Sequence, residues 1–119
     1  MPQYAAILYT HDLDWTAPEQ AADMDEYGAF SQTAAAVMRG GAALYPTSTA
    51  TTVRVAGGKG GEVLSTDGPY AESKEVLTGF FLLECADLDE AIALAAQIPA
   101  AWNGAVEVRP VIPMGPPAE

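Results

Sequence analysis

The chain has 119 residues, half of them hydrophobic, and its 16 acidic against 5 basic residues give a formal net charge of −11. This length fits one domain with a sizeable core. The acidity excludes the basic patch with which nucleic-acid-binding proteins neutralise phosphates, so we expect no direct contact with DNA or RNA.

One histidine and one cysteine cannot build a structural zinc site or an intramolecular disulfide. Cys85 lies in an apolar run and is expected to be a buried small hydrophobe. No cofactor motif is present, and we predict no cofactor or metal. We also expect a cytoplasmic protein, because there is neither a basic N-terminal leader nor an apolar run of the roughly 20 residues that span a membrane.

The first third of the chain predicts a strand followed by a helix. Residues 4–9 are a short apolar run. Thr16 as the N-cap with Glu19 three residues later is typical of a helix start. We expect that helix to end with Arg39 in its last turn, before Gly40-Gly41. Its apolar stripe is Met24, Tyr27, Phe30, Ala34 and Val37.

The middle of the chain predicts three further strands. A short strand covers residues 42–45. Residues 49–55 are rich in β-branched side chains, and the five residues 57–61 form a flexible tip that leads to a partner strand over residues 62–66. A phosphate-binding loop is the alternative for this glycine-rich tip, but no helix follows it, so we predict a plain hairpin.

The last third predicts strand, helix and strand. Residues 77–85 are almost continuously apolar, as in a central strand. Asp87 with Glu90 three residues later caps a second helix, which Pro99 ends. The buried stripe of that helix is predicted to be Leu88, Ile92, Ala95 and Ala96. A loop at Trp102-Asn103-Gly104 precedes a final alternating strand over residues 105–112.

The predicted order is β-α-β-β-β-β-α-β. Without the hairpin it becomes βαβ-βαβ, the α+β, ferredoxin-like arrangement in which two helices cover one face of an antiparallel sheet. We expect a single domain over residues 1–113 and a frayed tail over 114–119. The other face of the sheet would be apolar and uncovered, which predicts a homodimer with a dimeric α/β-barrel-like assembly.

The stretch Asp67-Gly68-Pro69-Tyr70-Ala71-Glu72-Ser73-Lys74-Glu75, followed by Leu77-Thr78-Gly79-Phe80-Phe81, resembles the signature of the YCII-related DGPF family. That signature has Phe where this chain has Tyr70, and Thr where it has Ser73. The resemblance implies a dimeric ferredoxin-like fold in a family whose members mostly lack an assigned activity, several being encoded beside or fused to sigma factors. A more distant relative is a dehydrochlorinase. The broader superfamily has a proposed His–Asp pair with its histidine on the first helix, where this chain has Tyr27.

The candidate site residues surround that signature. For acid–base chemistry the candidates are Asp67 and His11. For ligand binding they are Tyr9, Arg54, Tyr70, Glu72, Lys74, Phe80 and Arg109. Each has a plainer alternative, since Asp-Gly-Pro is good turn chemistry and isolated charges are usually solvated.

Two functions follow from the sequence. The first is an enzyme or binding protein for a small organic molecule, either anionic or uncharged, in a pocket on the sheet face of the homodimer. The second is a non-catalytic interaction module for a protein such as a sigma factor.

Overall fold

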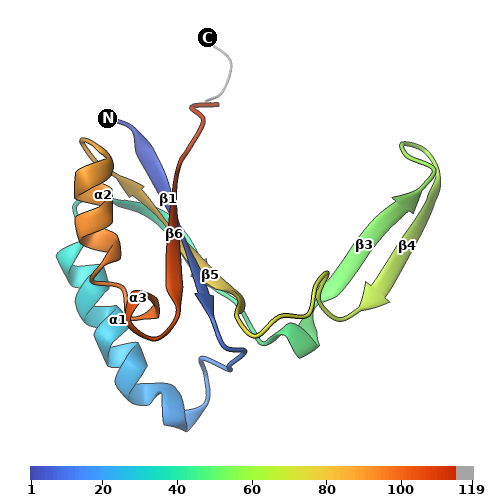
Figure 1. The fold of residues 1–119 in the computed structure, drawn as a ribbon, viewed down its shortest axis with the longest axis horizontal. Helices are drawn as coiled ribbons and strands as arrows, with labels where there is room; N and C mark the ends of the chain where they lie inside the picture. The colour runs from blue at the N-terminus through green and yellow to red at the C-terminus, as the bar shows by residue number, and fades with distance from the viewer. Residues whose placement is uncertain (115–119) are drawn as a thin grey trace.

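The computed structural model describes residues 1–114 as one four-stranded antiparallel sheet with helices on one side, and a separate two-stranded hairpin (Figure 1). The strands are β1 (Gln3–Thr10), β2 (Met38–Ala43), β3 (Thr51–Ala56), β4 (Glu62–Asp67), β5 (Val76–Glu84) and β6 (Ala105–Pro110). The helices are α1 (Ala21–Thr33), α2 (Leu88–Ala95) and α3 (Ala100–Asn103), with short 3₁₀ turns η1 (Pro18–Gln20) and η2 (Thr47–Thr49).

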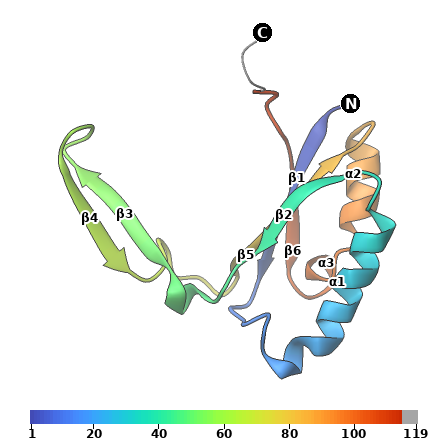
Figure 2. The same ribbon diagram turned by 180° about the vertical axis from the view of Figure 1, so that it is seen from behind.

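The strand order in the sheet is β2-β5-β1-β6, with every neighbouring pair antiparallel. All three helices lie on the same face, as both views of the ribbon show (Figures 1 and 2). This α+β arrangement is compatible with the ferredoxin-like fold expected from the sequence.

The strict alternation of β1 separates the two faces of the sheet. Tyr4, Ala6, Leu8 and Thr10 are buried on the face that the helices cover. They pack with Phe30 and Ala34 of the first helical segment, and with Leu83, Ile98 and the buried thiol of Cys85. The odd-numbered residues of β1 point to the opposite face, which we call the open face and which no helix covers.

The hairpin β3–β4 extends away from the sheet on the side of the open face (Figure 1). Its register pairs Thr51 with Asp67 and Val55 with Val63, so the predicted hairpin is confirmed. The signature turn follows β4, and Gly68 has φ +104, a value that favours glycine. The Gly68 amide donates to the Ala50 carbonyl at 2.8 Å, which closes the base of the hairpin.

The predicted limits of the first helix were wrong at both ends. Asp14 accepts bonds from the amide and hydroxyl of Thr16, so Thr16 closes a local turn instead of capping the helix, which starts at Ala21. At the other end the helix stops at Thr33, and Arg39 lies in β2. Gly40-Gly41 does not terminate a helix but pairs with β5 inside the sheet.

The predicted stripe of the second helix was also partly wrong. Asp87 caps α2 as expected, because its carboxylate accepts from the Glu90 amide at 2.9 Å. However, Ala91 and Ala95 are the buried residues, while Leu88 and Ile92 are about half exposed. The pair Leu88 and Ile92 and the pair Ala91 and Ala95 both have helical spacing. The alanines face the sheet because their small side chains let the helix approach it more closely.

The last part of the chain differs in detail. Trp102 and Asn103 belong to α3 and not to a loop, and the final strand ends at Pro110. Residues 115–119 of the predicted tail lie outside the described part of the chain.

Candidate functional site

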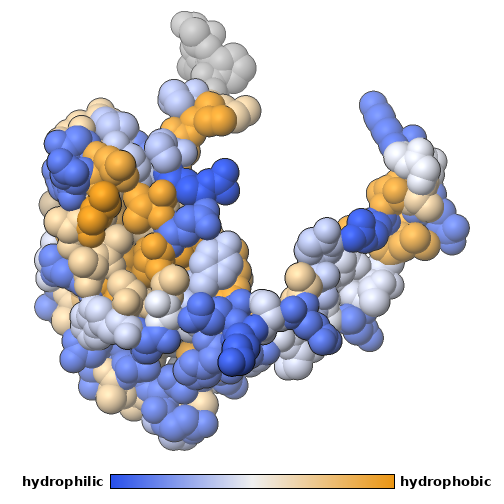
Figure 3. Space-filling model, in the orientation of Figure 1, coloured by the Kyte–Doolittle hydropathy of each residue, from blue (hydrophilic) through white to orange (hydrophobic). Residues whose placement is uncertain are grey.

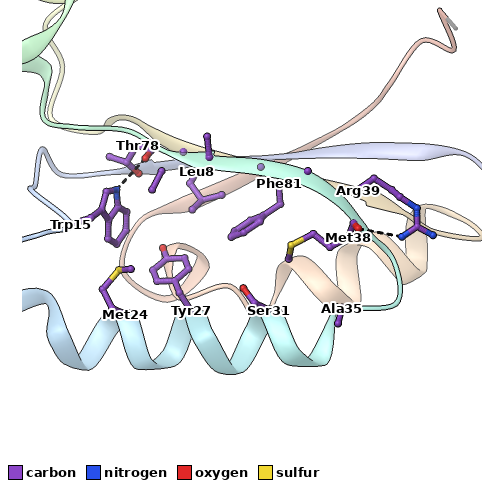
Figure 4. Close-up of a pocket in the computed structure, with 15 residues that line it drawn as sticks. Leu8, Trp15, Met24, Tyr27, Ser31, Ala35, Met38, Arg39, Thr78 and Phe81 are labelled. Atoms are coloured by element: carbon purple, nitrogen blue, oxygen red, sulfur yellow. Dashed lines mark hydrogen bonds between the residues drawn. The ribbon is translucent and has the colours of Figure 1, made fainter.

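A cleft of about 690 Å³ opens between α1 and the edge of the sheet formed by β2 and β5 (Figure 4). We call it the α1 cleft. Its lining comprises Leu8, Trp15, Met24, Tyr27, Ser31, Ala35, Met38, Arg39, Gly40, Gly41, Ala42, Ala43, Thr78, Gly79 and Phe81. The side chains are mainly apolar, with a few hydroxyl groups and one guanidinium group.

Three of the sheet positions that line the cleft lack large side chains, and this leaves room above them. Gly41, Ala43 and Gly79 share the helix-covered face, since Gly41 pairs with Phe81 and Ala43 with Gly79. A Cβ atom at Gly41 would lie 2.6 Å from the Phe80 carbonyl oxygen, and one at Gly79 would lie 2.7 Å from that of Ala42. These two glycines therefore permit close strand pairing and leave the space above it empty.

A row of aromatic rings runs through the cleft from Trp15 in the loop, over Tyr27 of α1, to Phe81 of β5. The ring of Trp15 meets that of Tyr27 edge-on, with centroids 5.0 Å apart. Tyr27 stacks loosely on Phe81 at 6.5 Å, and Phe81 packs on the buried Phe30 at 5.1 Å. This row of rings links the cleft to the core, so the wall is anchored by packing.

An irregularity in β5 holds Trp15 in place. The β1–β5 register pairs Leu8 with Gly79 and Tyr9 with Leu77, so Thr78 is an extra, bulged residue. Its carbonyl accepts a bond of 3.2 Å from the Trp15 indole nitrogen (Figure 4). Its buried hydroxyl accepts from the Thr10 hydroxyl at 3.3 Å. The loop that carries Trp15 is thus fastened to the sheet beside the cleft.

Tyr27 places a phenol on the wall of the cleft. Burial raises its pKa to about 12, an effect that the Ala100 backbone amide partly opposes and Asp23 reinforces. The phenol therefore keeps its proton at neutral pH and can donate a hydrogen bond. It lies on the first helix, as the resemblance to the broader superfamily implied.

Arg39 lies at one end of the cleft, and its guanidinium group already has partners. Nε is 3.2 Å from a carboxylate oxygen of Glu84, and NH1 donates to the carbonyls of Ala36 and Met38. Its charge is therefore largely compensated before any ligand arrives.

Two of the predicted ligand-binding residues meet elsewhere, in a second cavity of about 790 Å³ where the hairpin joins the sheet. We call it the hinge pocket. Tyr9 and Tyr70 both line it, together with Thr51, Val53 and Leu77 among others. The predicted Arg54 also lies close by, because its guanidinium carbon is 5.1 Å from the centre of the Tyr70 ring.

The remaining predicted residues do not converge with them. Asp67 ends β4 and His11 follows β1, both exposed and both outside the lining of either cavity. Phe80 and Arg109 lie on the open face, since they pair with Ile7 and Ala5 of β1. Arg109 is 3.6 Å from Glu107 on its own strand. Glu72 and Lys74 are exposed in the segment before β5.

Sequence reasoning missed most of the α1 cleft. Tyr27 was assigned to a core stripe, and Gly40-Gly41 was interpreted as a helix stop. The signal that could have revealed the site is Trp15, the one aromatic side chain besides His11 in the mainly polar segment between β1 and α1.

Residues 1–114 contain no group of three His, Cys, Asp or Glu side chains placed to hold a metal ion. None of the helices in the same part of the chain is both long and apolar enough to cross a membrane.

Fold and cleft together define an α+β protein with a helix-covered antiparallel sheet and a mostly apolar small-molecule-sized cavity. The model of the YCII-related domain matches residues 3–115, and the chain belongs to that family, as its signature indicated. An uncharacterized protein of Rhizobium meliloti (strain 1021), R00369, is 46% identical over 72 residues, which are 59% of this chain and 56% of that protein. The match thus spans only about half of this curated relative.

Proposed function

We propose that the protein binds a small, largely apolar organic molecule in the α1 cleft. The observation that carries this proposal is a cleft of about 690 Å³. Its sheet side includes glycines without side chains, and a row of aromatic rings lines it. Small-molecule sites typically have roughly 300–1,000 Å³ and mainly apolar walls with few polar groups.

The polar groups of the cleft favour an uncharged ligand. Tyr27 offers a neutral phenol and Ser31 a hydroxyl, either of which can donate to a carbonyl or hydroxyl oxygen. The one cation at the cleft, Arg39, is bonded to Glu84. A net charge of −11 further disfavours the anionic molecule that the sequence left open.

The geometry supports binding more directly than turnover. The acid–base candidates Asp67 and His11 lie outside the cleft. Tyr27 inside it has a pKa of about 12, which makes it a hydrogen-bond donor and not a base at neutral pH.

The test is a titration with 2-naphthol, a neutral aromatic alcohol, followed by tryptophan fluorescence and by calorimetry. Ser31→Phe projects a ring into the cleft, whereas Gln32→Phe places the same ring on an exposed position of α1 outside the lining. We expect Ser31→Phe to weaken binding at least about tenfold, or 1.4 kcal/mol, and Gln32→Phe to leave it unchanged. Equal affinity in both variants would exclude the cleft as the site.

The interaction module remains a second candidate because of one observation on α2. Leu88 and Ile92 lie one turn apart and are 46% and 50% exposed, and Trp102 nearby is 60% exposed. Exposed apolar side chains that cluster are typical of protein contacts. Calorimetry of a sigma factor with wild type and with Ile92→Asp tests this candidate, which requires binding that the substitution abolishes.

The predicted homodimer belongs to the same proposal. It is supported by the open face, whose apolar residues by register are Ala5, Ile7, Tyr9, Leu77, Phe80 and Leu82, with Glu107 and Arg109 of β6 beside them. All helices lie on the other side of the sheet (Figure 2). Light scattering at micromolar concentration tests it, and a monomer mass would contradict it.

A further inference from the structure

The hairpin β3–β4 lacks a core of its own. Among the residues of its two strands only Thr52 is even partly buried. Val53, Val55, Val63 and Leu64 are 43–66% exposed. The space-filling view shows hydrophobic surface on the extended arm (Figure 3). An isolated two-stranded hairpin is at best marginally stable in water, so a further surface is needed to support it.

One side of the hairpin carries all three of these valines, whereas Leu64 lies on the other side with Arg54. The register pairs Val53 with Ser65 and Val55 with Val63, which places these four residues on one side, the valine side. Val53 lines the hinge pocket together with Tyr9 and Leu77 of the open face. The valine side and the open face therefore meet at the hinge pocket, and Val53, Tyr9 and Leu77 make the meeting point mainly apolar.

The total surface is larger than that of an ordinary monomer. The chain exposes 7946 Å², whereas a monomer of this mass exposes about 6,100 Å². Its radius of gyration is 16.6 Å, against about 13.5 Å for a compact chain of this length. The excess area exceeds the roughly 800 Å² that each partner buries in a standard interface.

The charge distribution favours a second copy as the occupant of this surface. In the hairpin, Arg54 and Lys59 balance Glu62 and Asp67, so the whole net charge of −11 lies on the rest of the chain. A neutral, apolar arm can contact the strongly acidic body of another copy without electrostatic repulsion. Two acidic bodies in direct contact would repel each other.

We propose that a second copy of the chain packs against the valine side and the open face, and thereby closes the hinge pocket. The pocket is then shared between two copies and is incomplete in one. Its lining residues Tyr45 and Tyr70, 68% and 77% exposed in the single chain, become protected. This inference rests on the proposed homodimer and adds the hairpin as the element that secures it.

The first experiment is sedimentation of wild type, Val53→Asp and Ala29→Asp. Val53→Asp adds a charge to the valine side, and Ala29→Asp adds the same charge to an exposed position of α1. We expect wild type and Ala29→Asp to be dimers, and the dissociation constant of Val53→Asp to rise at least about a hundredfold, since a desolvated charge costs several kcal/mol. Far-UV circular dichroism checks that the body stays folded.

The second experiment uses wild type alone and so avoids any effect of the substitution on hairpin folding. Hydrogen exchange of the hairpin amides and nitration of Tyr70 by tetranitromethane are compared above and below the dissociation constant. Both should be slow in the dimer and fast after dilution.

The outcomes separate this inference from the proposals on which it depends. A wild-type monomer overturns the homodimer and the inference together. A dimer that survives Val53→Asp with unprotected hairpin amides overturns only the hairpin role. Binding of 2-naphthol is measured independently, because the α1 cleft lies within one chain.

Discussion

The indole ring of Trp15 stands edge-on to the phenol ring of Tyr27, with centroids 5.0 Å apart and planes at 85°. The two residues come from a loop and a helix, and their contact forms the outer end of the aromatic wall of the α1 cleft (Figure 4). Edge-to-face aromatic pairs of this kind add about 0.5–1.5 kcal/mol beyond the area they bury.

Replacing Trp15 should therefore destabilise the protein as well as the cleft. Trp15→Ala removes the ring contact with Tyr27 and the bond to the Thr78 carbonyl. Because Trp15 is only partly buried, we expect a loss of about 2 kcal/mol, below the roughly 3–5 kcal/mol typical of buried tryptophan. Urea denaturation followed by circular dichroism measures it. Trp102→Ala, at an indole that is 60% exposed, is the control and should cost less. Equal losses would show that the Trp15 contacts contribute little.

Tyr27 should ionise well above the ordinary pH range of a tyrosine. Its pKa is raised from 10.0 to about 12, chiefly by burial. The neutral phenol is therefore favoured in the folded state. The corresponding contribution to stability is complete below pH 10 and is lost as the pH rises from 10 to about 12. Ultraviolet titration of tyrosinate should show a late step that disappears in Tyr27→Phe. If that variant keeps the step, the phenol is not in this environment.

The glycines beneath the cleft should not tolerate a methyl group. A Cβ at Gly79 meets the Ala42 carbonyl oxygen at 2.7 Å, so Gly79→Ala must separate β2 from β5 and should cost about 1–3 kcal/mol. Gly28 in α1 has nothing within 4 Å of the same atom. Gly28→Ala is the matched control and should stabilise the helix by about 0.5–1 kcal/mol. Thermal denaturation of both variants gives the signs, and the same sign in both would contradict the close strand approach.

Asp12 should fasten the base of the hairpin in a pH-dependent way. Its carboxylate accepts bonds from the hydroxyl and the amide of Thr47, and these bonds lower its pKa below 3.8. A lowered pKa means that this contribution to stability is present above pH 3.8 and is lost as the pH falls through the folded value.

Asp12→Ala should thus lower the free energy of unfolding near neutral pH, while the difference from wild type should vanish in acid. Urea denaturation at a series of pH values measures the difference. Asp25→Ala, an exposed acidic position on α1, is the control for general charge removal. A difference that does not depend on pH would exclude the ionised carboxylate as its cause.

The sequence by itself determined the family, the order of the six strands and the two longer helices, and the faces of the main strands. The nine-residue signature from Asp67 to Glu75 and the alternation of β1 are local patterns, and both survive in the structure. The Asp87 cap and the glycine-rich hairpin were predictable for the same reason, because a few neighbouring residues specify them.

Only the tertiary structure decided where the cavities lie. Gly41 and Gly79 are 38 positions apart in the chain, and only the pairing of their strands, β2 and β5, shows that both leave space beneath α1. The same applies to the stripe of α2, where Leu88 and Ile92 have the right spacing for burial but Ala91 and Ala95 face the sheet. Periodicity gives the faces of an element, whereas which face is buried depends on how closely distant elements can approach.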